Sequence, residues 1–292
     1  MNSRLPPALA ALLCTPAGTS VQANHAAEPT NGAVSGPELA RLLQEAYAGY
    51  QLTSTLWVDG GIFHSNVGME SWVSRDNPTY TRSLVADFPP YYAAGVRAVW
   101  QAMPKLAVRL DVVNGWQNIS ETNTDKAAGL RLDYALTPAA ILSYYNFVGN
   151  EAGSRLRVFN GVGVNGAFTD RVRVMAQLDY GTQQRDGGDG TSTWYGFTAG
   201  GRVQMSPAVA LAGRVERFDD DDQVLIATGA ALPGFRANSA SLGLDVAPHH
   251  KVLWRTEVRG YQGEDAIFPD RDEPSGVAKS SAVFVTSLAL TY

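Results

Sequence analysis

The last stretch of the chain, SAVFVTSLALTY at residues 281–292, decides how the rest of the sequence is interpreted. Counted back from the end, every second residue is apolar or aromatic, with one threonine among them: Tyr292, Leu290, Leu288, Thr286 and Phe284. The residues between them are smaller and more mixed. A period of two residues is that of a β-strand, because successive side chains point to opposite faces of a sheet. The stretch therefore predicts a C-terminal strand that ends on an aromatic residue.

The same alternation recurs along the chain and predicts about 13–14 strands. The segments upstream of the last strand are 42–52, 56–63, 91–101, 106–116, 127–136, 140–149, 156–168, 172–182, 194–205, 209–218, 235–246 and 252–261. Short turns that contain Pro, Asp or Ser alternate with longer loops that collect acidic residues, such as the run at 219–222. Short turns on one rim and longer loops on the other are the plan of a bacterial membrane barrel, with the short turns in the periplasm.

Each predicted strand has one apolar face and one face that carries charge near its middle. A soluble barrel would point the apolar face inward, but side chains fill an interior of only about 8 strands, and a wider barrel would leave a lumen. The inverse arrangement places the apolar face against lipid and the charges against water, and a closed barrel pairs every backbone group. The sequence therefore predicts an all-β fold, an antiparallel transmembrane β-barrel. The predicted lumen-lining residues are Arg97, Arg109, Asp111, Arg131, Asp133, Arg173, Asp179, Arg202, Arg214, Glu216, Arg255, Glu257 and Arg259.

Aromatic residues near the strand ends predict girdles at the two membrane interfaces. These residues are Tyr91, Tyr92, Trp100, Trp116, Tyr134, Trp194, Tyr195, Tyr261 and Tyr292.

Composition excludes several other classes of protein. The chain has 292 residues, 45% of them hydrophobic and only 17% charged. It lacks the long apolar run of a membrane helix downstream of its N-terminus. The net charge of −5 argues against nucleic acid as a partner. A single cysteine, Cys14, excludes a disulfide framework and a cysteine-based metal site. No cofactor and no metal site are expected.

The N-terminal sequence predicts a cleaved signal peptide followed by a flexible segment. Residues 1–23 contain Arg4, a moderately apolar run and then Val21-Gln22-Ala23, which is the order of a secretory signal peptide. The polar segment 24–41 predicts a flexible N-terminal segment ahead of a barrel at 42–292. The segments above make an odd number of strands, whereas a bacterial barrel of this kind has an even number. Either a weak first strand supplies a fourteenth, or the sheet keeps a poorly sealed seam.

Sequence motifs that are more specific than the alternation lie between residues 57 and 118. They are WVDGGIF at 57–63, Asp76-Asn77, Tyr80-x-Arg82-Ser83-Leu84, Tyr92-x-x-Gly95-Val96-Arg97 and Asn114-Gly115-Trp116. These residues resemble the OmpL-like putative beta-barrel porin-2 family of Gram-negative bacteria, over about residues 42–292. The resemblance implies an outer-membrane barrel that passes small solutes, without catalytic residues to carry over. It also implies that the last strand, ending at Tyr292, is read by the barrel-assembly machinery as an insertion signal.

The loop at 64–90 is too long for a simple connection, and long loops are usually functional. One interpretation is that it folds into the lumen and that Glu70, Arg75, Asp76 and Arg82 form a constriction with charges of both signs. The other is an external lid that never enters the pore. Arginines outnumber acids on the predicted inner face, which favours a slight preference for anions.

The leading functional hypothesis is therefore passive diffusion of small hydrophilic solutes through a charged, water-filled lumen in the outer membrane. An alternative is an adhesion or receptor barrel whose lumen is blocked. A barrel enzyme is the least favoured hypothesis, because no Gly-x-Ser-x-Gly or similar nucleophile motif accompanies His64.

Overall fold

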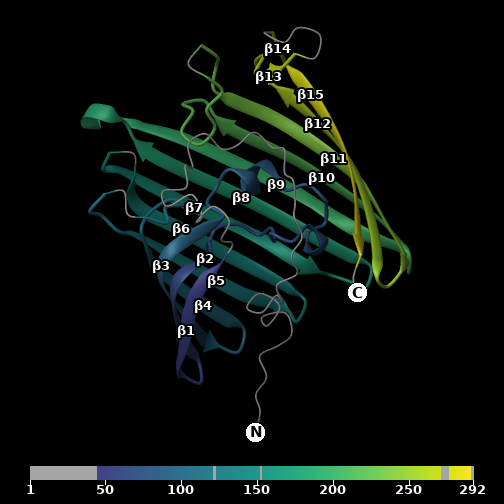
Figure 1. Cartoon of the computed structure of the whole chain (residues 1–292), viewed down its shortest axis with the longest axis horizontal. Helices are drawn as coiled ribbons and strands as arrows, with labels where there is room; N and C mark the ends of the chain where they lie inside the picture. Colours follow the sequence, from purple (N-terminus) through teal and green to yellow (C-terminus); the bar gives the residue numbers. More distant parts are fainter. Residues whose placement is uncertain (1–44, 121–122, 152, 230, 271–275, 291–292) are drawn as a thin grey trace.

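The chain folds into one long, curved antiparallel sheet (Figure 1). The computed structural model describes residues 45–120, 123–151, 153–229, 231–270 and 276–290. Thirteen strands follow one another around the sheet in sequence order, from β1 to β12 and then β15. The predicted signal peptide, residues 1–23, and the predicted flexible segment, 24–41, lie outside the described residues, and so does Tyr292.

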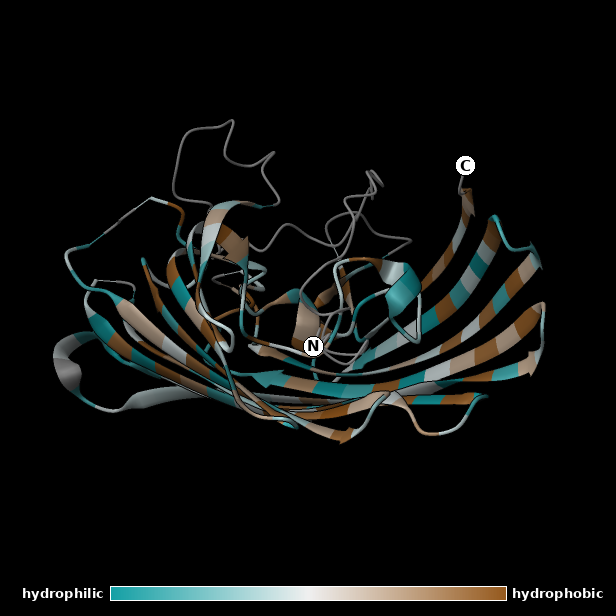
Figure 2. Cartoon of the chain, turned by 90° about the horizontal axis from the view of Figure 1, so that it is seen from below, coloured by the Kyte–Doolittle hydropathy of each residue, from teal (hydrophilic) through white to brown (hydrophobic). Residues whose placement is uncertain are grey.

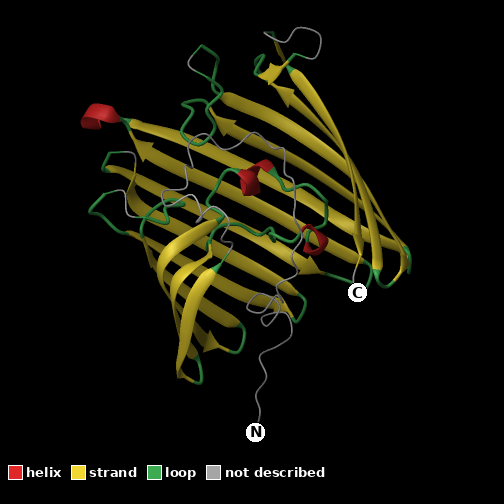
Figure 3. Cartoon of the chain, in the orientation of Figure 1, coloured by secondary structure: helices red, strands yellow, loops and turns green. Residues whose placement is uncertain are grey.

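The strands of the main sheet are β1 (Ala46–Thr53), β2 (Leu56–His64), β3 (Tyr92–Met103), β4 (Leu106–Val113), β5 (Ala127–Thr137), β6 (Ala140–Glu151), β7 (Arg155–Ala167), β8 (Val172–Gln184), β9 (Thr191–Ser206), β10 (Val209–Asp220), β11 (Phe235–His249), β12 (Val252–Gly263) and β15 (Ser280–Leu290). Two short strands, β13 (Phe268–Pro269) and β14 (Val277–Ala278), pair with each other in the last loop. Among the residues that the structure describes, helical structure is confined to η2 (Ser74–Asp76), α2 (Leu84–Asp87) and η3 (Asp186–Gly188) (Figure 3). Among the described residues, no helix has the length and apolar composition needed to cross a bilayer.

The predicted strand count is confirmed, with ends that shift by a few residues. One correction concerns the predicted strand at 106–116, which ends at Val113. The cause is local, because Gly115 has a φ of 139° and Asn114 Nδ2 donates a hydrogen bond to the Ile119 carbonyl 2.8 Å away. Trp116 therefore leaves the sheet and points over its inner face.

The two faces of the sheet carry the residues that the alternation assigns to them. Seen along its edge, the sheet is a trough whose strands change between apolar and polar at each residue (Figure 2). On the convex side, Leu178 and Trp254 are 54% and 51% exposed. On the concave side, Arg131 and Arg255 are only 6% and 3% exposed. The apolar band thus faces outward and the charges face the enclosed space.

The sheet has two free edges among the described residues, because β1 pairs only with β2 and β15 pairs only with β12. β1 runs into the short turn at 54–55, and β15 starts after the long loop at 264–279, so both strands run from the loop rim to the turn rim. The two edges are therefore parallel to each other. The predicted fourteenth strand would precede β1, in residues that lie outside those described.

If the outward apolar band lies in lipid, a charged side chain placed on it should destabilise the protein most at the middle of the bilayer and least near its surface. We expect Leu178→Arg, at the middle of β8, to lower the free energy of unfolding in lipid vesicles by about 2–4 kcal/mol, because an arginine would replace leucine in hydrocarbon. Leu136→Arg, beside the end of β5, is the matched control and should cost only about 0–1 kcal/mol. Equal, small costs at both positions in denaturant titrations would show that the convex face is not in lipid.

Candidate functional site

The loop between β2 and β3, residues 65–91, lies against the concave face of the sheet and is called the inner loop here. It carries η2 and α2 and crosses in front of the strands from β5 to β12 (Figures 1 and 3). The concave face of the main sheet is called the inner wall.

Arginines of the inner wall donate hydrogen bonds to backbone carbonyls of the inner loop. Arg131 Nη1 on β5 donates to the Asn66 and Gly68 carbonyls at 2.9 and 2.8 Å. Arg255 on β12 donates to the Asn77 and Pro78 carbonyls at 3.2 and 3.0 Å, and it also reaches the Ser74 carbonyl. The loop backbone is thus anchored from both ends of the inner wall.

Two further arginines hold the middle of the inner loop. Arg214 on β10 donates to the hydroxyl of Thr79 and to the carbonyl of Thr81. Arg259 on β12 donates to the Arg82 carbonyl at 2.8 Å. Since a guanidinium has five fixed donors and no acceptor, it can bind a loop carbonyl and a wall carboxylate at the same time.

Acceptors of the inner wall bind the backbone N–H groups of the same loop. Thr81 donates its N–H to Glu257 Oε2 at 2.8 Å and its hydroxyl to Glu257 Oε1 at 2.6 Å. Leu84 donates its N–H to Glu216 Oε2 at 2.6 Å. These two carboxylates are fully buried and each also lies beside an arginine, so their charges are neutralised in place.

Glycines of the inner wall leave space for apolar side chains of the inner loop. A Cβ on Gly196 of β9 would lie 2.5 Å from Val85 Cγ1, and one on Gly163 of β7 would lie 2.5 Å from Met69 Cγ. Val85 is completely buried. The absence of a side chain at these two positions therefore lets α2 and the start of the loop sit directly on the strands.

A buried aromatic cluster fills the inner side of the loop rim. Trp116 contacts Phe147, Phe159 and Trp194 with ring centroids 5.0, 5.3 and 6.3 Å apart, and Arg157 lies over both tryptophans. The predicted membrane girdle is therefore wrong for Trp116 and Trp194, which are buried on the concave side. Trp194 shares its face with buried Thr198, so the alternation along β9 already assigned it inward.

The predicted constriction residues fall into two pairs along the inner loop. Arg75 and Asp76, in η2, lie with Nε and Oδ1 4.0 Å apart and are both exposed in part. Glu70 accepts a hydrogen bond from the Ser83 N–H at 3.0 Å. Arg82 donates to the Ala86 carbonyl at 2.6 Å and lies over the ring of Tyr91. Only the first pair is turned toward open space.

The predicted lumen residues lie on the inner wall with two degrees of burial. The fully buried ones are Arg97, Asp111, Arg131, Asp133, Asp179, Arg214, Glu216, Arg255, Glu257 and Arg259. Most of these form ion pairs, such as Arg97–Asp111 at 3.1 Å and Arg131–Asp133 at 2.8 Å. Arg109, Arg173 and Arg202 are half-buried, which leaves them partly accessible to solvent. Sequence reasoning omitted Arg157 and Asn165 from this face, although their strand parity assigns them to it.

An ion-pair network joins the loops at the opposite end of the strands from the short turns. Arg217 bonds Glu264 at 2.6 Å, and Arg185 bonds Asp222 at 2.8 Å. The hydrogen bond from Arg217 lowers the pKa of Glu264, and that from Arg185 lowers the pKa of Asp222. Because both pKa values are depressed, these contacts persist at neutral pH and are lost as the pH falls through the folded-state values.

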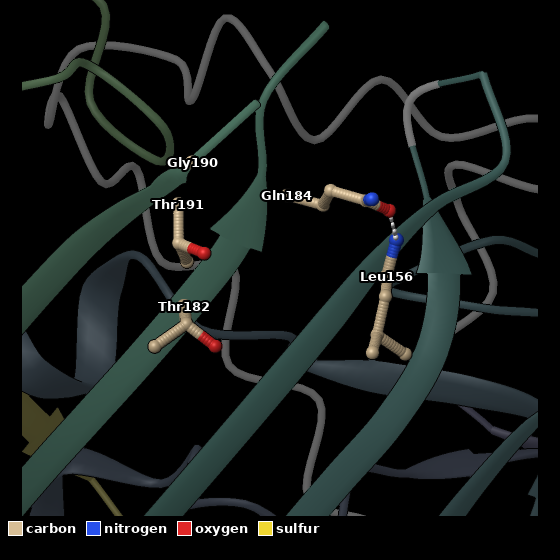
Figure 4. A pocket seen from close by; sticks show the side chains of 5 residues that line it. All are labelled: Leu156, Thr182, Gln184, Gly190 and Thr191. Carbon is tan, nitrogen blue, oxygen red and sulfur yellow. Dashed lines mark hydrogen bonds between the residues drawn. The ribbon is translucent and has the colours of Figure 1, made fainter. Parts of the chain in front are cut away.

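A shallow surface pocket lies near the loop rim and is lined by Leu156, Thr182, Gln184, Gly190 and Thr191 (Figure 4). The Leu156 N–H donates to Gln184 Oε1 at 3.4 Å. The lining has no ionisable group and belongs to the convex side, so it offers no chemistry to a solute in the lumen. In the described part of the chain, no three His, Cys, Asp or Glu side chains are grouped as a metal site.

The sequence profile described as "Putative beta-barrel porin-2, OmpL-like" matches residues 13–292. The chain belongs to this porin family. It is thus a porin of the Gram-negative outer membrane, where it lets small hydrophilic solutes diffuse through its barrel. No curated protein sequence matches the porin significantly.

Solved structures of similar fold are outer-membrane channels of low sequence identity. The anion-selective porin from Comamonas acidovorans has a TM-score of 0.58 and 11% identity, over 85% of this chain and 78% of that chain. OmpT of Vibrio cholerae has a TM-score of 0.55 and 9% identity, over 84% and 80%. DcaP of Acinetobacter baumannii has a TM-score of 0.52 and 13% identity, over 84% and 78%. At these identities the likeness supports the barrel fold alone.

The close contact between α2 and Gly196 predicts that a larger side chain at position 196 would displace the inner loop. We expect Gly196→Leu to displace the inner loop, because the new side chain would overlap Val85. Proteolysis within residues 65–91 of the folded protein should then increase. Gly260→Leu is the control, since a Cβ on Gly260 meets nothing within 4 Å. If the loop stays protected in Gly196→Leu, this contact does not hold it in place.

Proposed function

We propose that solutes cross the barrel between the inner loop and the part of the inner wall that the loop does not cover. In this proposal the inner loop is the constriction, with Glu70, Arg75, Asp76 and Arg82 as its charged residues. Arg75 and Asp76 face the solute, whereas Glu70 and Arg82 fix the shape of the loop through Ser83 and Ala86. The observation that carries the proposal is the set of wall arginines bonded to loop carbonyls from β5 to β12.

The predicted lumen-lining residues take two roles under this proposal. Those bonded to the inner loop, such as Arg131 and Arg255, are occupied by it and hold it rigid. Half-buried Arg109, Arg173 and Arg202 act on solutes directly. An external lid would not need these bonds, because such a loop would lie beyond the strand ends.

The chain acts as a channel and not as an enzyme in this proposal. Of the described histidines, His64 contacts the ring of Trp72 with centroids 4.7 Å apart, and its Nε2 lies 3.6 Å from Glu45 Oε1. The pair of His249 and His250 sits at the turn rim. Neither arrangement presents a nucleophile within reach of a base, which nucleophilic catalysis requires.

The proposal also covers how the porin reaches the outer membrane. Residues 1–23 would direct export and be removed, and residues 24–41 would form a flexible segment ahead of the barrel at 42–292. The barrel-assembly machinery would then read the closing strand that ends at Tyr292. The outward face of β15, with exposed Phe284, Leu288 and Leu290, has the apolar character that such an insertion signal needs.

Thiol labelling at η2 tests the constriction. In a Cys14→Ser background, we expect Arg75→Cys to give single-channel steps in planar bilayers whose size falls when a bulky thiol reagent is added, because the reagent would narrow the passage beside Asp76. Arg171→Cys, in the exposed turn between β7 and β8, is the control and should keep its conductance. Complete labelling at position 75 without a change in step size would contradict the constriction. Wild-type protein that gives no steps at all would contradict the open pore.

A further inference from the structure

Two arginines face each other directly on the inner wall, near the turn rim. Arg173 on β8 and Arg202 on β9 are register partners in the ladder, so their side chains emerge side by side on the same face. Like charges at such positions are destabilising. Each is half-buried, so water screens the repulsion only in part. The chain therefore keeps an unfavourable contact at this place.

Arg202 shares one carboxylate with a neighbour. Its Nη1 lies 3.0 Å from Asp245 Oδ2, while Oδ1 of the same aspartate accepts from Arg255 Nε at 3.0 Å. Small Ala212 stands beside Arg202 on β10, and this lets the arginine reach across to β11. One negative charge thus serves two guanidinium groups.

The positive charge of Arg173 is balanced less well by its neighbours than that of Arg202. Among the described residues it forms no salt bridge within 4.0 Å, and its contacts are two long ones, 3.4 Å from Nε and Nη2 to Asn165 Oδ1. Asn165 is fixed in this orientation, because its Nδ2 donates to the Met69 carbonyl at 3.0 Å. Asp76 is the acid whose charge acts on Arg173, but Asp76 also faces Arg75. Positive charge is therefore in excess here.

Resting on the proposed passage, we infer that Arg173 and Arg202 form a transit site for small carboxylate anions. A guanidinium presents parallel N–H donors that match the two oxygens of a carboxylate, and charge-assisted bonds of this kind are the strong ones. An anion between the two arginines would remove their repulsion. Asp76 opposite limits how tightly it binds, so the anion can leave again, as conduction requires.

Reversal potentials in planar bilayers test the site. In water, a unit charge roughly 5 Å away changes the local concentrations of chloride and potassium by about threefold to fourfold each, in opposite directions. Under a gradient of dilute KCl we therefore expect the wild type to prefer chloride over potassium, and Arg173→Gln to lower the chloride-to-potassium permeability ratio by about tenfold. Arg171→Gln is the matched control, since it removes the same charge from the exposed turn of the same hairpin. Its ratio should stay close to that of the wild type. Equal shifts in both variants, or no shift in Arg173→Gln, would overturn the site.

Arg173→Lys separates charge from carboxylate recognition. Lysine keeps the charge but not the paired donors, so the chloride preference should persist while the ratio of acetate to chloride permeability falls. An unchanged acetate ratio would overturn the carboxylate assignment. Folding of each variant is checked by heat-modifiable migration in gels, and if Arg173→Gln does not fold, Arg173→Lys decides the test. Wild-type protein without current steps would contradict the pore itself, which is a different result from a pore without anion preference.

Discussion

The bond between buried wall arginines and loop carbonyls is the interaction on which the rest of the structure depends. A trough lined by guanidinium and carboxylate groups cannot pack like a protein core, because buried charge is costly unless it is paired and hydrogen-bonded. Arg131, Arg214 and Arg255 meet this requirement by bonding the inner loop as well as a neighbouring acid or hydroxyl. The loop in turn needs the wall, because few of its backbone groups are paired within the loop itself. Wall and loop are thus each incomplete without the other.

Sequence patterns could predict the sheet but not the contacts across it. Alternation is a local signal, and it located the strands of the main sheet and the inward face of Arg131 and Arg255, but not the short strands β13 and β14. The same alternation also assigns Trp194 to the inward face. Its position near a strand end instead predicted a place in the membrane girdle. The bonds from Arg255 to the carbonyls of Asn77 and Pro78 join residues far apart in the chain. Their acceptors are backbone atoms that every residue has, so no residue type marks them. The sequence likewise does not predict the role of Gly163 and Gly196, because only the fold shows which side chains of the inner loop lie against them.

Under the proposed passage, the inner wall divides its arginines between those that hold the inner loop and those that act on solutes. A guanidinium that is fully bonded to the loop has no donor left for a solute, whereas Arg173 holds only long contacts to Asn165. Removing a partner from a buried charge pair costs about 3–5 kcal/mol, so the inner loop is not expected to open and close by thermal motion. A constriction that is rigid for this reason selects by the charges it leaves free. Its selectivity is then a property of the few half-buried cations and not of the whole lumen.

The direction of the edge strands limits how the barrel can close. β1 and β15 both run toward the short turns, so joining them directly would require one parallel pair in an otherwise antiparallel sheet. Closure with antiparallel pairs alone needs an odd number of further strands between them. A second copy inserted in the same orientation does not provide this, because each of its edges would run in the same direction as those of the first. An exposed edge inside a bilayer leaves unpaired N–H and C=O groups in hydrocarbon, which is too costly to persist. A strand that completed the barrel with antiparallel pairs alone would therefore run from the turn rim to the loop rim, opposite to both of its neighbours.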